Sequence, residues 1–303
     1  MSAGHEIRSK INSVKSTQKI TCAMELVAAS KMKKAKNRMD SVRSYSQCLN
    51  KIVSHLIKAN LEYTPSYFKN CSNINRVGII IVSTDRGLCG GLNINLFKMV
   101  LERIKYYRQK NIEINLCVLG LKAKTFFGNI AGLKIISSTS FSNGITPLTI
   151  SGSISTMIEE FDKKRINKIE LFSNKFVNAI RQKPFYRQIL PVVKSSFFEE
   201  ELSDSNDDKT HAKEDVGGNW DYLYEPCAKE VLNLLVNRYI ESQVYASVVE
   251  NFSCEQASRM LAMKNATDNA GEIIDKLKLK YNKARQAIIT QELAEIVSGA
   301  SAV

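Results

Sequence analysis

The two ends of the chain are poor in residues that break helices. All five prolines lie from Pro65 to Pro226, so residues 1–64 and 227–303 contain none. The same two flanks hold only three of the fourteen glycines. Because proline and glycine are the strongest helix breakers, their scarcity argues against short helices joined by turns and predicts one very long helix at each end.

Cysteine and histidine follow no motif. The seven cysteines are an odd number, widely scattered, with no CxxC pair, and the three histidines share no ligand spacing with them. We therefore expect reduced thiols and no metal site. No Ser/His/Asp, Cys/His or paired-carboxylate arrangement can be assembled, so the chain is predicted to be non-catalytic and to carry no cofactor.

Long apolar runs are also missing. No run approaches the roughly 20 residues that a membrane helix needs. The basic residues near the N-terminus are not followed by an apolar stretch, which argues against a secretory signal. Any attachment to a membrane is therefore expected to be peripheral.

One loop resembles a phosphate cradle. Ser83–Asn93 (STDRGLCGGLN) follows a predicted strand, contains three glycines and ends at a residue suited to cap a helix. It lacks both GxGxxG and GxxxxGK[ST], so no lysine is placed for phosphates. We interpret it as a glycine-rich turn that permits close packing of strand and helix.

The charge is strongly positive. A formal net charge of +13, from 43 basic and 30 acidic residues, predicts attraction to acidic partners but does not choose among nucleic acid, anionic lipid and protein. Basic residues gather on the first helix, at Lys31, Lys33, Lys34, Lys36 and Arg38. This cluster lacks the interleaved aromatics of a nucleic-acid helix, so we expect an exposed coiled-coil face that contacts an acidic protein loop.

Heptad spacing runs through the first flank. Steps of four and three from Ile7 reach fifteen positions, of which eleven are apolar: Ile7, Ile11, Val14, Gln18, Thr21, Glu25, Ala28, Met32, Ala35, Met39, Val42, Ser46, Leu49, Val53 and Leu56. Such a repeat predicts a coiled-coil seam. The three polar residues from Gln18 to Glu25 are interpreted as a break in it, and the nearby stripe of Ile20, Met24 and Val27 is expected to touch something other than the partner helix.

The same spacing from Leu232 is mostly apolar until Gln291 and Glu295, where the seam becomes polar. At 1.5 Å per residue, the two flanks would span about 95 Å and about 115 Å. We expect them to fold back as an antiparallel, left-handed pair, with the longer C-terminal helix projecting beyond the other. The polar stretches at Gln18–Glu25 and Gln291–Glu295 are expected to lie close together.

The centre alternates strands and helices, which predicts an open, Rossmann-like α/β layer. The predicted strands are 77–83, 113–120, 133–137, 168–177 and 185–192, and the predicted helices are 93–110, 121–128 and 152–164. A polar, acidic stretch follows it. We divide the chain into a coiled-coil helix (1–64), a central α/β domain (65–198), an acidic flexible linker (199–219) and a second coiled-coil helix (220–303).

Several stretches resemble the gamma subunit family of F-type ATP synthases. Glu6–Ala35 (EIRSKINSVKSTQKITCAMELVAASKMKKA) is similar to the family's N-terminal helix, and Thr84–Asn93 (TDRGLCGGLN) to its central-domain motif. Trp220–Pro226 (WDYLYEP), Arg238–Ile274 and Ile289–Ala302 (ITQELAEIVSGASA) are similar to its C-terminal helix. The resemblance covers nearly the whole chain.

The resemblance implies a non-catalytic rotor in a proton-translocating complex. Its partners would be the alpha, beta, epsilon and c subunits, with no nucleic acid, no small-molecule substrate and membrane contact only through the c ring. The expected location is the cytoplasmic face of a bacterial inner membrane. The c ring would turn the shaft, and the shaft would change the conformation of the catalytic beta subunits.

Particular residues are expected to make these contacts. Contacts with the alpha and beta subunits are expected from Lys19, Ile20, Met24, Lys31, Lys33, Lys34, Gln291, Glu292 and Glu295. Tyr222, Tyr224 and Glu225 are candidates for the neck that meets the c ring and epsilon, with ordinary packing as the alternative.

Two other functions remain open at this point. A basic coiled-coil tether or nucleic-acid-binding protein would explain the charge and the heptads but not the α/β insert. An α/β nucleotide enzyme with helical arms would explain the insert.

Overall fold

The computed structural model describes residues 2–58, 66–68, 74–142, 144–192, 225 and 227–301. Contacts divide the chain into two units, one of Met1–Lys31 with Arg259–Val303 and one of Met32–Ser258. The predicted linker over 199–219 lies outside the described residues, and the three boundaries between the four predicted segments stay predictions.

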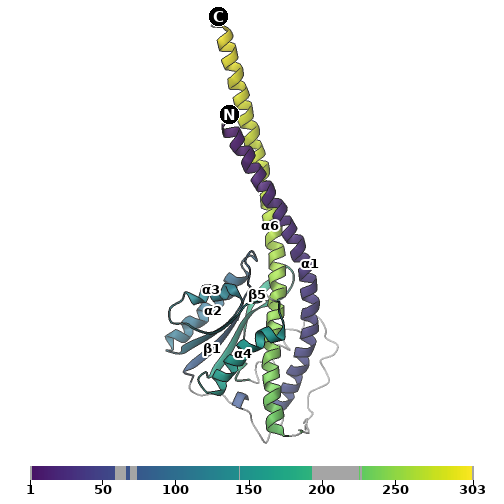
Figure 1. Ribbon diagram of the computed structural model, residues 1–303, viewed down its shortest axis with the longest axis vertical. Helices are drawn as coiled ribbons and strands as arrows, with labels where there is room; N and C mark the ends of the chain where they lie inside the picture. Colours follow the sequence, from purple (N-terminus) through teal and green to yellow (C-terminus); the bar gives the residue numbers. More distant parts are fainter. Residues whose placement is uncertain are drawn as a thin grey trace. The chain divides into compact units, whose positions relative to one another are not determined.

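Two long helices form the ends of the chain. Helix α1 is Ser2–Lys58 and helix α6 is Ala228–Ser301 (Figure 1). Within the second unit they run antiparallel, because the partner number falls as the number along α1 rises, from Arg38 with Tyr245 to Asn50 with Gln243. The expected class, two terminal helices flanking a central sheet domain, is confirmed.

The heptad seam of the first unit is visible in the burial of its side chains. The seam positions of α1 are buried or half-buried among exposed neighbours: Ile7, Ile11, Val14, Gln18, Thr21, Glu25 and Ala28. The facing positions of α6 show the same spacing: Met263, Thr267, Ala270, Ile274, Leu277, Tyr281, Ala284 and Ile288. This is the 3.5-residue spacing of knobs-into-holes packing.

The interpretation of Gln18–Glu25 as a break in the seam is wrong. Gln18 Nε2 donates to the carbonyl of Thr267 at 3.4 Å, and the hydroxyls of Thr21 and Thr267 lie 2.8 Å apart. Polar side chains can occupy a seam when each finds a partner across it. Gln18 and Thr21 therefore belong to the seam, where they make hydrogen bonds to the partner helix in place of apolar contacts.

In the second unit the two helices pack against a five-stranded sheet. Its order is β3-β2-β1-β4-β5, with β1 to β4 parallel and β5 antiparallel to β4. The strands are β1 (Arg76–Val82), β2 (Glu113–Leu119), β3 (Lys134–Thr139), β4 (Lys168–Phe176) and β5 (Gln182–Leu190). The remaining helices are α2 (Leu92–Gln109), α3 (Leu121–Gly128), α4 (Pro147–Asp162) and the short η1 (Ser66–Phe68).

The sheet separates two apolar cores. Alternate residues of β1 point to opposite faces, as the pleat requires: Ile79 and Ile81 join the core under α2 and α3, while Ile80 and Val82 join the other. That second core also contains side chains of α4, Leu49 of α1 and a run of α6 residues. The sheet domain is thus attached to both long helices through one of its faces.

Most predicted elements lie within a few residues of the observed ones. Helix α4 is the main difference, because it begins at Pro147 and not at Gly152. The Thr146 hydroxyl accepts a hydrogen bond from the backbone N–H of Thr149, and the Thr149 hydroxyl accepts one from the backbone N–H of Thr146, which closes a capping box. Proline at the first helical position adds to the start signal.

Candidate partner-contact site

The place where doubly wound sheets bind nucleotides is filled by protein in this fold. That place is the crevice at the carboxyl ends of the strands where the strand order reverses, here between β1 and β4. Cys89 and Leu92 after β1 pack with Cys254 of α6, all three buried. Asn174 at the end of β4 donates to Asn251 of α6 at 2.8 Å.

The glycine-rich loop after β1 directs its polar groups inward. Asp85 accepts hydrogen bonds from the backbone N–H groups of Leu121 (2.9 Å) and Phe141 (2.6 Å). Asn93 donates to the hydroxyl of Thr84 at 2.7 Å. The loop therefore ties β1, α2 and α3 together, which favours the interpretation of a close-packed turn over a phosphate cradle.

No group of three or more His, Cys, Asp or Glu side chains is placed to hold a metal ion among the residues that the structure describes. Within the same ranges, no helix combines the length and hydropathy needed to cross a bilayer.

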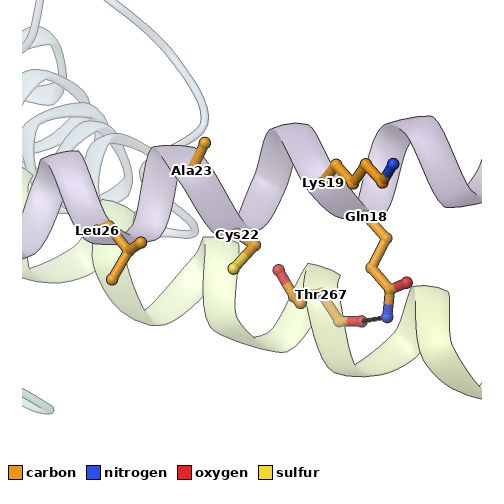
Figure 2. A pocket seen from close by; sticks show the side chains of 6 residues that line it. All are labelled: Gln18, Lys19, Cys22, Ala23, Leu26 and Thr267. Atoms are coloured by element: carbon orange, nitrogen blue, oxygen red, sulfur yellow. Dashed lines mark hydrogen bonds between the residues drawn. The ribbon is translucent and has the colours of Figure 1, made fainter.

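An open groove of about 440 Å³ runs along the first unit (Figure 2). Six residues line it: Gln18, Lys19, Cys22, Ala23, Leu26 and Thr267. Figure 2 shows Gln18 reaching across to Thr267, with Cys22 and Leu26 following at intervals of one turn on the same face of α1. The Gln18 bond thus fixes the spacing of the two helices at the groove.

Of the sequence-predicted contacts Lys19, Ile20 and Met24 on α1, the structure places one at this groove. Lys19 lines it, Ile20 is exposed and Met24 is half-buried at the edge of the seam. Leu26, which is apolar and 67% exposed, was not predicted as a contact residue. Its signal was present, because an apolar residue between two seam positions has no place in the two-helix core.

The last turns of α6 present a second surface. Gln291, Glu292 and Glu295 are exposed as expected, and Gln291 donates to Glu295 at 2.9 Å on the same helix face. Four exposed apolar residues also follow helical spacing here: Ile289, Leu293, Ile296 and Val297. Of these four, Val297 was expected in an apolar surface at the tip, whereas Ile289, Leu293 and Ile296 were not predicted.

These two surfaces do not lie close together, contrary to the expectation. Gln18 is bonded to Thr267, and Gln291 lies 24 residues further along α6 (291 − 267). That separation is about 36 Å along a helix axis. The error came from the register, since the heptad pattern fits several registers and only the cross-helix contacts choose one.

Most of the basic cluster on α1 faces solvent. Lys31, Lys33, Lys34 and Lys36 are exposed. Arg38 is used inside the second unit, where it donates to the Tyr245 hydroxyl at 2.6 Å and also to a backbone carbonyl. Only the lysines therefore remain candidates for binding an acidic loop.

The predicted neck is only partly described. Tyr222 and Tyr224 lie outside the described residues, and Glu225 is exposed. Their contact with the c ring and epsilon stays a prediction.

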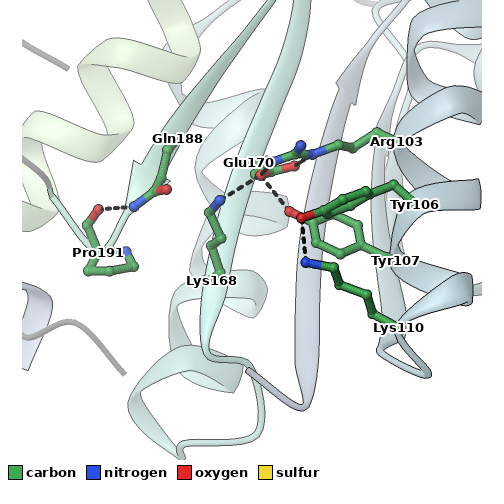
Figure 3. Close-up of polar contacts among 8 residues, drawn as sticks. All are labelled: Arg103, Tyr106, Tyr107, Lys110, Lys168, Glu170, Gln188 and Pro191. Atoms are coloured by element: carbon green, nitrogen blue, oxygen red, sulfur yellow. Dashed lines mark hydrogen bonds and ion pairs between the residues drawn. The ribbon is translucent and has the colours of Figure 1, made fainter. Parts of the chain in front are cut away.

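A buried ionic network joins α2 to β4 (Figure 3). Glu170 accepts hydrogen bonds from Arg103 (2.6 and 3.0 Å), Tyr107 (2.6 Å) and Lys168 (2.8 Å). Burial by itself would raise the pKa of Glu170, but these donors outweigh it and hold the pKa below its usual range. The carboxylate thus has four hydrogen bonds from residues of the same domain, which indicates a structural role.

Comparisons with known proteins agree across the chain. The family model described as ATP synthase matches residues 3–303. The chain is 49% identical over 304 residues to an ATP synthase gamma chain of Coxiella burnetii (strain CbuG_Q212), and 48% identical over 305 residues to that of Ruthia magnifica subsp. Calyptogena magnifica. Both alignments cover 100% of each chain.

Solved structures show the same fold. A rotor chain of the Euglena gracilis mitochondrial ATP synthase superposes with a TM-score of 0.65 at 16% identity, covering 95% of this chain and 99% of that one. A central stalk chain of the Tetrahymena thermophila enzyme gives a TM-score of 0.57 at 24% identity, covering 82% and 99%.

Proposed function

The chain belongs to the family of ATP synthase gamma chains, and from that membership we propose that it is the central rotor subunit of a bacterial F-type complex. It is a non-catalytic subunit, and ATP forms on the beta subunits. Rotation of the c ring turns the two-helix shaft, and the shaft sets the conformation of each catalytic site in turn. The complex sits at the cytoplasmic face of the bacterial inner membrane.

One observation carries the proposal: the first unit is a two-helix rod whose surface differs from side to side. A rotating element can change the state of a stator site only if it makes different contacts at different angles. The groove lined by Lys19 and Leu26 lies on one part of this surface, and exposed lysines such as Lys31 lie on another. Such unevenness provides the differential contact energy.

We assign the contacts with the alpha and beta subunits to three sets. The first is Lys19, Ile20 and Met24 on α1, and the second is the tip residues Gln291, Glu292 and Glu295. Lys31, Lys33 and Lys34 form the third, which meets acidic loops. All except the half-buried Met24 are exposed, which supports their availability to a partner.

The contacts with the c ring and epsilon subunit are assigned to Tyr222, Tyr224 and Glu225. Membrane contact then occurs only through the c ring, and the subunit needs no nucleic acid or substrate of its own.

Native mass spectrometry of the membrane-extracted complex tests the assignment. We expect one copy of this chain with the alpha, beta, epsilon and c subunits. A chain that instead purifies alone and binds duplex DNA tightly at physiological salt, with a steep salt dependence, would support the nucleic-acid-binding alternative.

The contact assignments have their own test. Met24→Lys, or deletion of residues 291–303, should lower ATP synthesis driven by a proton gradient more than it lowers the amount of assembled complex. Leu148→Asp is the matched control, because Leu148 is exposed and apolar but belongs to α4 of the sheet domain. Normal coupling in both shaft variants would show that these contacts are assigned wrongly.

A further inference from the structure

One glutamine joins both long helices to the sheet. Gln243 of α6 is 3% exposed, and its Oε1 accepts a hydrogen bond from Arg187 of β5. Its Nε2 donates to Ser46 (3.0 Å) and Asn50 (2.7 Å), both on α1. An amide nitrogen has two hydrogens, so both donors are used and the three elements meet at one side chain.

A second set of bonds holds α6 to the end of β4. Asn251 accepts from Asn174 at 2.8 Å, and this pair is buried. One residue earlier on α6, Glu250 accepts from the backbone N–H of Phe176 at 2.9 Å. The helix is therefore bonded to side chain and backbone of the same strand end.

A third bond extends the contact by two further turns of the helix. Ser258 donates to Gln182, at the start of β5, at 2.7 Å. From Gln243 to Ser258, α6 is thus bonded to the hairpin of β4 and β5 at successive levels.

Apolar packing alone would hold this joint less firmly against twisting. Val244 and Val248 of α6 share a core with Ile189 and Leu190 of β5. Burial of apolar surface is non-directional, so a helix that rotates slightly in such a core keeps most of its stabilisation. Hydrogen bonds weaken steeply with angle and distance, so they resist the same rotation.

We propose that Gln243, together with the Asn174–Asn251 pair, is the contact that fixes the sheet domain to the shaft helices and lets turning force pass between them without slip. The proposal rests on the proposed rotor function. Gln243 acts as a positioning residue, because it holds the elements that carry the load and contacts no partner.

Single-molecule rotation of the alpha, beta and gamma subcomplex tests this. A bead is attached to a cysteine introduced by Lys124→Cys, an exposed position of α3, in a background without other accessible cysteines. The angular spread of the bead during pauses reports torsional stiffness between the sheet domain and the stator. ATP hydrolysis without a bead reports the catalytic cycle alone.

Gln243→Met keeps the length of the side chain and removes its hydrogen bonds. We expect a broader angular distribution and unchanged bead-free hydrolysis. Gln243→Glu keeps the acceptor for Arg187 and should recover much of the stiffness. Arg238→Met is the matched control, since Arg238 is an exposed residue of α6 that pairs with Glu241 one turn along the same helix.

The outcomes separate the proposals. If the angular spread of Gln243→Met equals that of the unmodified complex, the proposed role of Gln243 is wrong. A fall in bead-free hydrolysis together with a broader angular spread would also contradict it. If Gln243→Met does not assemble, Asn251→Ser and Ser258→Ala are measured in the same way, and unchanged stiffness in both overturns it. An unmodified complex that does not rotate would refute the rotor function itself.

Discussion

Replacing Glu170 by glutamine removes a buried negative charge while keeping the side chain's volume. The Glu170 side chain is fully buried, whereas those of its partners Arg103 and Lys168 are 28% and 18% exposed. Glutamine can still accept one hydrogen bond, but it cannot balance two cations. The variant therefore isolates the value of the charge in holding α2 against β4.

The size of the effect follows from the burial. Removing one partner of a fully buried ion pair costs about 3–5 kcal/mol. Arg103 and Lys168 keep some contact with water, and glutamine retains part of the bonding, so we expect the domain to lose about 2–3 kcal/mol. Arg103 also keeps its positions over the rings of Tyr106, Tyr107 and Tyr186, which limits the loss.

The pH dependence has a definite sign. The donors hold the folded-state pKa of Glu170 below the unfolded value, which is about 4.3. The carboxylate then contributes stability above about pH 4.3, and this contribution is lost as the pH falls through the folded pKa. Glu170→Gln should therefore flatten the acid side of the stability profile and lower the plateau near neutrality.

Hydrogen exchange at the backbone amides of β1 and β4, in the full chain, measures this loss of stability locally. A global unfolding signal would include the long helices and would hide it. Glu113→Gln is the matched control, because the Arg76–Glu113 pair is exposed on the same sheet and pairs of that kind contribute about 0–1 kcal/mol. Equal, small effects from the two variants, with the same acid profile, would refute the reasoning.

Two further substitutions test local geometry. Gly120 has φ +108°, and a Cβ there would lie 2.6 Å from the Ser83 carbonyl oxygen, so Gly120→Ala should destabilise the domain by more than about 2 kcal/mol, measured by hydrogen exchange at the backbone amides of the sheet. Gly152→Ala, in an open position of α4, should stabilise it by about 0.5–1 kcal/mol instead. In the first unit, Thr21→Val and Thr267→Val should each cost about 1 kcal/mol, and the double variant should cost less than their sum. Additive losses would show that the two hydroxyls do not interact.

The elements of the fold could be predicted because local signals agreed. The absence of proline from the two flanks predicted the terminal helices, and the apolar run Val77–Ser83 predicted a central strand of the sheet. The start of α4 was missed, because Thr146–Thr149 closes a capping box without the glutamate or glutamine that usually marks it.

The site could be predicted only as a set of surfaces. Contact residues such as Lys19 and Gln291 were predicted from the family resemblance, and the structure shows only that they are exposed. Gln243 could not be found from the sequence, since a glutamine beside a seam position looks like a solvent-exposed residue until the sheet is placed against it. Glu170 gave a weak signal as the only acidic residue within strand β4.

The polar residues within the seam of the first unit explain why one register is adopted. A strictly apolar heptad repeat packs nearly as well after a shift of seven residues, because every seam position still meets an apolar one. A shift that moves Thr267 away from Gln18 and Thr21 would break the hydrogen bonds across the seam, leaving the Gln18 amide facing apolar groups and each threonine hydroxyl with only its bond to a carbonyl of its own helix. Each lost hydrogen bond costs about 0.5–1.5 kcal/mol, so the polar seam residues make the observed register lower in free energy than its neighbours. A single register is what a shaft requires, because its surface can present fixed contacts to a stator only if its two helices do not slide past each other.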